Sequence, residues 1–401
     1  MFSDLTLNVN LDKYKFPIQL NPAFTFKIYT SASNLPSNWD HLAVNNIFLT
    51  SNYLKVLEAS APENIACHFI GLFNNEDLVG LALSQFINLS HVSSFGERDH
   101  CLKTEVRNFV FKNFCSNVLV IGNNTLTGQN AFCFDEILPV QEGLLLLNKA
   151  AKEIQNQFFK KGLNIHLTVF KDFSASDIQH FKIPEFKSFF LFSTQPNMIF
   201  EIKEKWQLFD DYIGDLSKKY RDQYKRARKK AEGISKRKLS LEEIRNYNDR
   251  IHELYMDVAK NAPFNTFYLP ENHFEIFKKH LHDKFLFYGY FIDGELIGFN
   301  TLIKNGTDID TYFLGYDEKC QREKMLYLNM LYDMIGYSVN KGYKRIIFAR
   351  TALEIKSSVG AKPVKMFGLI KHSNGVLNLF MSKLFGFFEP EMNWQERNPF
   401  K

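Results

Sequence analysis

The sequence predicts a mixed α/β protein made of two similar halves, and three observations carry this prediction. The stretch Phe285–Lys371 changes its hydrophobic period in the order strand, strand, strand, helix, strand, helix. Parts of that order recur earlier in the chain. A chain of 401 residues also exceeds one ordinary hydrophobic core. We therefore expect two tandem domains with mixed sheets, at residues 1–195 and 196–401.

The second half begins its regular pattern with a hairpin. Phe285–Ile292 alternates bulky apolar residues, Asp293-Gly294 supplies a tight turn, and Glu295–Ile303 returns as a second strand. A third strand is expected at Asp308–Gly315.

A helix and a fourth strand follow. Gln321–Val339 has helical spacing, and Gly342 is expected to close this helix in a left-handed conformation. Tyr343–Phe348 reads as the next strand. Thr351, with Glu354 three residues later, predicts a capping box for a short helix that runs toward Gly360.

The first half gives a similar order with weaker signals. The expected strands are Phe24–Tyr29, His68–Phe73, Leu78–Ile87, Asn117–Gly122 and Ile165–Phe170, and the expected helices are Phe48–Ala59, Val106–Phe114 and Leu144–Phe159.

Two local patterns occur in both halves. Phe73–Gly80 and Phe291–Gly298 share the hairpin sequence F-x-x-x-D/E-L-V/I-G. Gly162 ends a helix before a strand that is followed by Lys171, just as Gly342 precedes a strand that is followed by Arg350. The order is preserved while the spacing differs, so we interpret the chain as a duplication of one domain.

Composition limits the class of protein. Hydrophobic residues at 45% and 41 phenylalanines exclude a disordered chain and predict large cores.

The N-terminus lacks the basic start and apolar core of a signal peptide, and five cysteines without CxxC spacing favour a reduced, cytoplasmic protein without a structural metal. No metal-ligand spacing occurs elsewhere. Val376–Phe388 is densely apolar, which leaves a docked helix and peripheral membrane contact as alternatives.

Positive charge is concentrated in one segment. Residues 215–238 hold eleven lysines and arginines against three acids, although the net charge of the whole chain is only +5. On a helix, one stripe would combine Lys218, Arg221, Lys225, Arg228 and Lys229. The stripe between Lys218 and Lys238 could contact tRNA or anionic lipid phosphates, or it could be a solvated helix.

These patterns together resemble the GNAT acyltransferase superfamily. The duplication, with the basic segment Leu216–Lys230 opening the second copy, resembles more narrowly the double-GNAT Fem-type transferases and related peptidoglycan-biosynthesis acyltransferases. The resemblance implies transfer of an acyl or aminoacyl group from a thioester or an aminoacyl ester to an amine, such as an amine of a cell-envelope precursor.

The same resemblance places a cofactor site. GNAT members hold the coenzyme pyrophosphate in a Q/R-x-x-G-x-G/A loop at a helix start. Gln321 and Arg322 occupy the corresponding place here, but Lys324 and Leu326 stand where the glycines belong. Acyl-CoA is therefore one possible donor, and aminoacyl-tRNA, which Fem-type enzymes use, is the other.

Three residues near the ends of the third and fourth strands are candidate catalytic groups. Tyr316 follows the third strand, where the resemblance implies an acid or an oxyanion donor, or it could be one of the many structural tyrosines of this chain. Arg350 could hold a phosphate or carboxylate, or it could pair with Asp308 or Asp310. Lys356 lies in the short helix beyond, as a site residue or as a surface lysine.

Two function hypotheses remain open at this point. In the first, the protein is a GNAT-like N-acyltransferase. In the second, it is a non-catalytic double-GNAT scaffold that binds an anionic ligand or partner. The absent glycines favour the scaffold, whereas Arg350 and Lys356 beside the fourth strand favour the enzyme.

Overall fold

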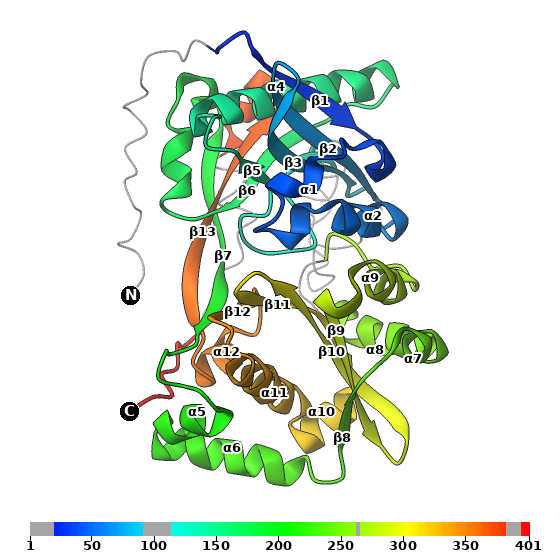
Figure 1. Cartoon of the computed structure of the whole chain (residues 1–401), viewed down its shortest axis with the longest axis vertical. Helices are drawn as coiled ribbons and strands as arrows, with labels where there is room; N and C mark the ends of the chain where they lie inside the picture. The colour runs from blue at the N-terminus through cyan, green and yellow to red at the C-terminus, as the bar shows by residue number, and fades with distance from the viewer. Residues whose placement is uncertain (1–19, 91–113, 262–264, 382–393) are drawn as a thin grey trace, which may run out of the picture.

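The computed structural model describes residues 20–90, 114–261, 265–381 and 394–401, and all statements on structure below concern these ranges. The first half of the chain forms the upper part of Figure 1, and the second half forms the lower part.

The first half follows the predicted order. Its elements are β1 (Phe24–Tyr29), η1 (Ala32–Asn34), α1 (Trp39–Leu42), η2 (Ile47–Leu49), α2 (Ser51–Ala59), β2 (Ile65–Asn74), β3 (Asp77–Asn88), β4 (Asn117–Ile121), β5 (Phe132–Phe134), α4 (Val140–Lys160), β6 (Leu167–Phe173), η3 (Asp177–Phe181), η4 (Pro184–Phe186) and β7 (Phe190–Glu201). The helix expected at Val106–Phe114 lies outside the described residues up to position 113.

The second half repeats the order with added helices in front. Its elements are α5 (Phe209–Asp215), α6 (Lys218–Lys230), β8 (Ser235–Lys238), α7 (Leu241–Asn246), α8 (Asn248–Lys260), α9 (His273–Leu281), η5 (His282–Lys284), β9 (Phe285–Ile292), β10 (Glu295–Asn305), β11 (Asp308–Tyr316), α10 (Glu318–Lys324), α11 (Leu326–Asn340), β12 (Arg345–Ala349), α12 (Leu353–Ser358), β13 (Lys362–His372) and α13 (Gly375–Leu379). The later part of the apolar stretch Val376–Phe388 lies outside the described residues from position 382.

Two predicted details of the second half are wrong. The single helix expected over Gln321–Val339 is divided into α10 and α11, because Met325 adopts a left-handed conformation with φ of 51°. The capping box at Thr351 does not form. Ala352 is the N-cap of α12 and gives no side-chain hydrogen bond, while Glu354 instead accepts a hydrogen bond from the backbone N–H of Gln395.

The hairpins of the two halves are geometrically equivalent, which supports the duplication. Both contain a register shift, between Leu72 and Phe73 in one and between Leu296 and Gly298 in the other. A Cβ added to Gly71 would lie 3.0 Å from the ring of Phe73, and one added to Gly289 would lie 2.7 Å from the ring of Phe291. In both halves, a phenylalanine two residues later covers the glycine, and this close approach excludes a larger side chain.

The strands of both halves form one continuous sheet, rather than two separate sheets. Its order is β1-β2-β3-β4-β6-β13-β7-β12-β11-β10-β9-β8, and β5 pairs with β3 outside this path. β4 pairs with β6 in parallel, as β11 pairs with β12. Figure 1 shows β7 and β13 as long neighbouring strands that run between the two halves.

The last strand of each half completes the sheet of the other half. β13, from the end of the second half, lies antiparallel to β6 of the first. β7, from the end of the first half, lies antiparallel to β12 of the second. The predicted domain boundary after residue 195 falls inside β7. This reciprocal exchange makes each half depend on the other for one strand.

Three of the four buried clusters of apolar side chains in the described ranges show how the layers are held together. One lies beneath α4 in the first half, and a second lies beneath α6 and α11 in the second half. The third joins the halves, because Tyr53 of α2 packs edge-on against Phe277 of α9 with ring centroids 5.8 Å apart. Many of the phenylalanines therefore serve as core residues, as predicted.

Nowhere in the described ranges is a helix both long enough and apolar enough to cross a bilayer.

Candidate active site

Strands β11 and β12 part from each other near the middle of the molecule. They pair only over Asp308–Asp310 and Arg345–Ile347. Beyond these residues, β11 continues along β10 as far as Tyr316, and β12 continues along β7 as far as Ala349. We call the region between the two diverging ends the β11–β12 fork. A fork between parallel strands leaves backbone groups and side chains facing a gap, so it is the natural place for a ligand in this fold.

The predicted site residues lie in two groups at opposite sides of the fork. Tyr316, Gln321 and Arg322 lie where β11 leads into α10 and α11, whereas Arg350 and Lys356 lie beyond the end of β12. Among the described residues, no hydrogen bond or ion pair joins one group to the other. The fork therefore separates the two groups that the sequence prediction placed together.

The side chain of Gln321 occupies the start of α11. Its Oε1 accepts a hydrogen bond of 3.0 Å from the backbone N–H of Tyr327, which is one of the free donors that a helix start would offer to an anion. Arg322 points away and pairs with Glu318 on the exposed side of α10. Tyr316 is partly buried beside Tyr327, and burial raises its pKa.

The start of α10 is equally unsuited to a pyrophosphate. Asp317 is its N-cap and accepts a hydrogen bond of 2.9 Å from the backbone N–H of Cys320. A carboxylate at this position accepts a hydrogen bond from the helix start, and its negative charge would repel a phosphate group. At each of the two helix starts that follow β11, a side chain of this chain therefore accepts a hydrogen bond from one backbone donor.

Arg350 forms an ion pair across the two halves of the molecule. Its Nη2 contacts the carboxylate of Asp172 at the end of β6 and lies 3.0 Å from the hydroxyl of Thr194 on β7. Asp172 is 0% exposed, and Lys171 Nζ lies 2.7 Å from its other oxygen. The alternative that Arg350 pairs with Asp308 or Asp310 is wrong, because Asp308 pairs with Arg345 instead.

Polar atoms around this pair remain unsatisfied. Arg350 Nε and Asn197 Oδ1 are buried and have no hydrogen-bond partner in the described part of the chain. Asn197 lies on β7, three residues after Thr194. Such groups are costly unless a water or a ligand satisfies them, so this region is polar and incomplete without a further molecule.

Lys356 is a buried lysine rather than a surface one. Its Nζ donates to the backbone carbonyl of Phe348 at 2.6 Å and to that of Arg350 at 2.5 Å. It is 5% exposed, and burial lowers its pKa to about 7. The backbone that it holds is strained, since Ala349, Thr351 and Ala352 all have positive φ. Strain of about 1–3 kcal/mol per residue persists where a site needs an unusual turn.

Asp310 was considered from the sequence only as a partner of Arg350, yet it is the carboxylate at the base of the fork. It is the last β11 residue that pairs with β12, and it is 6% exposed. Its one side-chain hydrogen bond among the described residues is a long one, 3.4 Å from Asn305 Nδ2. Burial raises its pKa to about 7. Two acids at alternate positions of one strand, Asp308 and Asp310, were the sequence signal for it.

Buried polar residues of the first half face Asp310 from across the interface. The Tyr53 hydroxyl, which accepts a hydrogen bond of 2.7 Å from Asn123 Nδ2, is near enough to interact with the Asp310 charge. Asn305 Oδ1 accepts from the backbone N–H of Ile47 at 3.0 Å. The fork therefore lies beside the loop that follows β4, which contains Asn123.

In the parts of the chain that the structure describes, no group of histidine, cysteine, aspartate and glutamate side chains is arranged to hold a metal ion.

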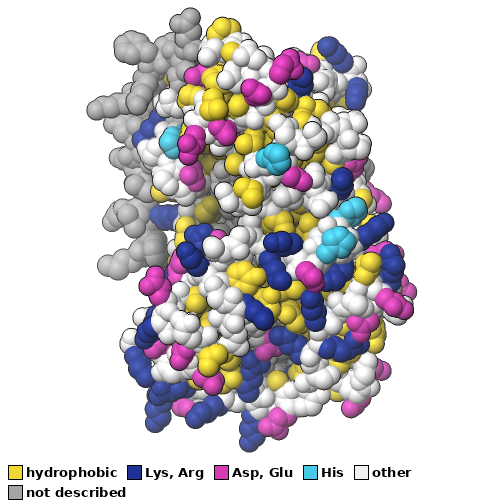
Figure 2. Space-filling view, in the orientation of Figure 1, with side chains coloured by type: hydrophobic (Ala, Val, Ile, Leu, Met, Phe, Trp, Pro, Cys, Tyr) yellow, Lys and Arg dark blue, Asp and Glu magenta, His cyan; other side chains and the backbone are white. Residues whose placement is uncertain are grey.

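The basic segment forms a helix that is fixed on one side and charged on the other. Arg228 Nη2 lies 2.8 Å from Asp333 Oδ1, and Asn329 Nδ2 donates to the carbonyl of Ala227 at 3.0 Å. Arg228 therefore does not belong to the predicted exposed stripe. The exposed cations of α6 are Lys218, Lys219, Lys225, Arg226, Lys229 and Lys230, and none of them forms an ion pair with a described residue. Figure 2 shows these dark-blue side chains gathered at the lower end of the molecule, where Figure 1 places α6.

Comparison with known proteins gives a fold but no family. No family model and no curated relative matches the sequence. Among solved structures, FemX superposes with a TM-score of 0.53 at 12% identity, covering 89% of this chain and 99% of its own. A tandem GNAT protein from the clavulanic acid biosynthesis pathway covers 88% of this chain and 99% of its own at 9% identity, with a TM-score of 0.49.

The superposition with FemX extends over nearly the whole of both chains, so the agreement concerns the arrangement of the two halves as well as the fold of each. This agreement confirms the fold expected from the repeated hairpin and the repeated helix cap. At this level of identity, it carries no information on substrate. The chain has a double-GNAT fold of the FemX kind.

Proposed function

We infer that this protein is an N-acyltransferase that transfers an aminoacyl group from aminoacyl-tRNA to an amine at the β11–β12 fork. The observation that carries the proposal is the buried carboxyl of Asp310 at the base of the fork, which forms no ion pair with a described residue. Amide formation requires the acceptor amine to lose a proton before or during attack. A carboxyl with a pKa near 7 can accept that proton at neutral pH, whereas an ordinary aspartate is too weak a base.

The occupied helix starts favour an RNA-linked donor over a coenzyme. Gln321 at the start of α11 and Asp317 at the start of α10 each occupy one backbone donor that a pyrophosphate would use, and the Asp317 carboxylate would also repel it. A donor held through an RNA backbone does not need that loop, because its phosphates can be bound elsewhere on the protein. The cationic face of α6 is suited to this task.

The α6 face favours RNA over a lipid surface. Helices that lie in a membrane interface combine a basic face with exposed Trp, Phe or Leu. The apolar side chains of α6 are instead turned into the protein, with Tyr220 7% exposed and Ala227 0% exposed. The exposed face of α6 thus carries positive charge that can bind phosphates, and it offers no apolar side chain that could insert into a membrane.

The acyl donor can be tested directly. We expect transfer of radiolabelled amino acids from charged total tRNA to a lysine-containing tripeptide or to phosphatidylethanolamine, and no transfer from acetyl-CoA. Acetyl-CoA should also leave the melting temperature unchanged, since a ligand that binds only the native state must raise it. Transfer from acetyl-CoA but not from charged tRNA would contradict the proposal.

Binding without transfer is the outcome that would favour the second hypothesis, a non-catalytic scaffold. The specific observation on its side is that Arg350 and Lys356 both have structural partners, in Asp172 and in two backbone carbonyls. If charged and uncharged tRNA bind equally and no amine is acylated, the scaffold is the better account.

The α6 face gives a second, separate prediction. Replacing Lys225, Arg226 and Lys229 by glutamine should weaken tRNA binding and make its logarithmic dependence on salt less steep by about 2, because fewer counterions are released. Fluorescence anisotropy at several salt concentrations measures both quantities.

A matched control is available in the first half of the chain. Lys55, Lys160 and Lys161 are also exposed and unpaired among the described residues. Their replacement by glutamine removes the same charge and should leave the salt dependence nearly unchanged. Equal effects of the two triple variants would assign the binding to net charge alone and remove α6 from the account.

A further inference from the structure

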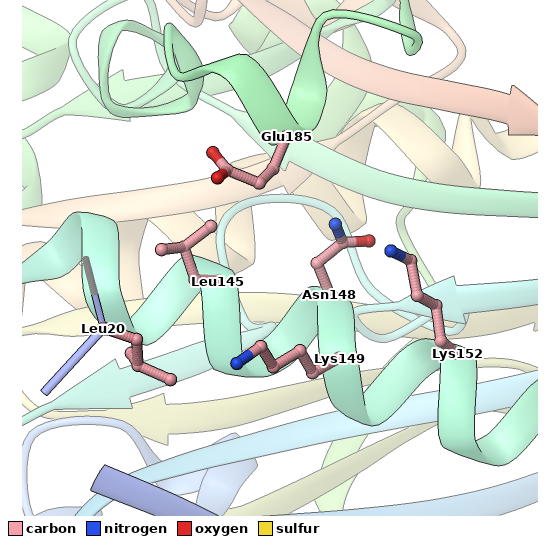
Figure 3. Close-up of a pocket in the computed structure, with 6 residues that line it drawn as sticks. All are labelled: Leu20, Leu145, Asn148, Lys149, Lys152 and Glu185. Atoms are coloured by element: carbon pink, nitrogen blue, oxygen red, sulfur yellow. The ribbon is translucent and has the colours of Figure 1, made fainter. Parts of the chain in front are cut away.

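A cavity in the first half has a polar lining that the chain itself does not satisfy. It lies between α4 and the short helix η4, and it has a volume of about 260 Å³. It is lined by Leu20, Leu145, Asn148, Lys149, Lys152 and Glu185 (Figure 3). Pockets for drug-sized ligands occupy about 300–1,000 Å³, so this cavity suits a smaller molecule.

One polar atom of its lining is buried and unpartnered. Glu185 Oε2 is buried without a hydrogen-bond partner in the described part of the chain. Asn148, which also lines the cavity, is 6% exposed. In Figure 3, the Glu185 carboxylate extends from η4 to a position above Leu145, and the Asn148 carboxamide points from α4 toward η4. A buried carboxylate oxygen without a donor costs free energy, so this arrangement calls for a donor from outside the chain.

The opposite charge lines the rim of the same cavity. Lys149 and Lys152 lie on the exposed side of α4 and form no ion pair within the described ranges. Lys371 of β13 is close enough for Lys152 to lower its pKa, although burial is the larger cause. Positive charge is therefore concentrated on one side of the cavity, and Glu185 supplies negative charge on the other.

We propose that this cavity binds a free α-amino acid with a small or medium apolar side chain. The ammonium group would donate to Glu185 and Asn148, and the carboxylate would face Lys149 and Lys152. Leu145 and Leu20 supply the apolar wall for the side chain. A simple anion would leave Glu185 without a donor, whereas a molecule that carries both charges would give Glu185 its donor and place a carboxylate near the exposed Lys149 and Lys152. The proposal is independent of the reaction at the fork.

Isothermal titration of the full chain with L-leucine tests the proposal, with N-acetyl-leucine and leucine methyl ester as probes that each lack one charge. We expect saturable binding of L-leucine and at least about tenfold weaker binding of each probe, because each loses a charge-assisted contact. Glu185→Gln should weaken leucine binding by about 10–100-fold, since it removes the charge that pairs with the ammonium.

Lys160→Gln is the control, because Lys160 ends the same helix and lines no cavity. It should bind leucine like the parent protein. If circular dichroism shows that Glu185→Gln does not fold, the double variant Lys149→Gln/Lys152→Gln takes its place. Both lysines are exposed, and the variant tests whether they bind the carboxylate of leucine. Absence of saturable binding up to about 10 mM would overturn the proposal and assign the cavity to water. Equal binding of the ester, or unchanged binding in Glu185→Gln, would also overturn it.

Discussion

Replacing Asp310 by asparagine is expected to make the protein more stable above pH 7, by up to about 4 kcal/mol. The carboxyl has a pKa of about 7 in the folded protein, because burial disfavours its charged form, against about 4 in an unfolded chain. The folded state thus holds a proton that the unfolded state releases as the pH rises from about 4 to about 7. The free energy of unfolding of the parent protein therefore falls between about pH 4 and about pH 7. The asparagine variant has no proton to release there and should not show this fall.

Urea denaturation at pH 5 and at pH 8 measures this effect. The gain should be large at pH 8 and small near pH 4, where both states hold the proton. Asp257→Asn is the control, since Asp257 is an exposed carboxyl on α8, and it should change stability by less than about 0.5 kcal/mol at either pH. An Asp310→Asn variant with the same pH dependence as the parent would show that the carboxylate is charged and satisfied.

The same substitution should abolish aminoacyl transfer if Asp310 is the base. Asparagine keeps the hydrogen bond with Asn305 but cannot accept a proton. A variant that is more stable and inactive would explain why a costly carboxyl is retained at the fork, because active sites commonly sacrifice stability for function. A more stable variant with full activity would remove Asp310 from the mechanism while leaving the burial argument intact.

Arg350→Ala is expected to lower the free energy of unfolding by about 3 kcal/mol, because it removes one of the two cations that pair with the buried Asp172 carboxylate. Asp172 is 0% exposed, and its remaining partner is Lys171. The change also breaks a contact between the first half and the second, so the effect should appear in the main unfolding transition. Urea denaturation with tryptophan fluorescence measures it.

Arg345→Ala provides a matched comparison within five residues. Arg345 also forms an ion pair, with Asp308, but its side chain is 46% exposed. Exposed pairs contribute about 0–1 kcal/mol, so this variant should be nearly as stable as the parent. If Arg350→Ala also keeps its stability but loses tRNA binding, then Arg350 is a ligand-binding residue and the pair with Asp172 is incidental.

The local elements were predictable because their signals lie within a few residues of each other. The hairpin pattern Phe291–Gly298 contains its own turn and alternation, so it predicts β9 and β10 without reference to the rest of the chain. The glycine caps at Gly162 and Gly342 are equally local, and both have positive φ as expected. Since the patterns occur twice in the same order, the sequence also predicted the duplicated fold.

The division of one predicted helix into α10 and α11 shows where local reasoning fails. Periodicity across Gln321–Val339 is nearly continuous, and nothing in it indicates that Met325 will adopt a left-handed conformation. The break is stabilised by contacts with a distant segment, as Asn329 of α11 hydrogen-bonds to the carbonyl of Ala227 on α6. Those contacts also decide that Gln321 caps a helix instead of lying free beside a ligand.

By itself, the sequence determined the class of fold, the duplication and the position of the basic helix, because each depends on composition or on patterns shorter than a single element. Only the tertiary structure decided the candidate site. The exchange of β7 and β13 brings Asp172 to Arg350, 178 residues away, and the packing of the halves buries Asp310. Pairing between distant strands and burial of a charge depend on the whole chain, because they arise from the free energy of the assembled sheet. Neither of them produces a periodic pattern in the sequence.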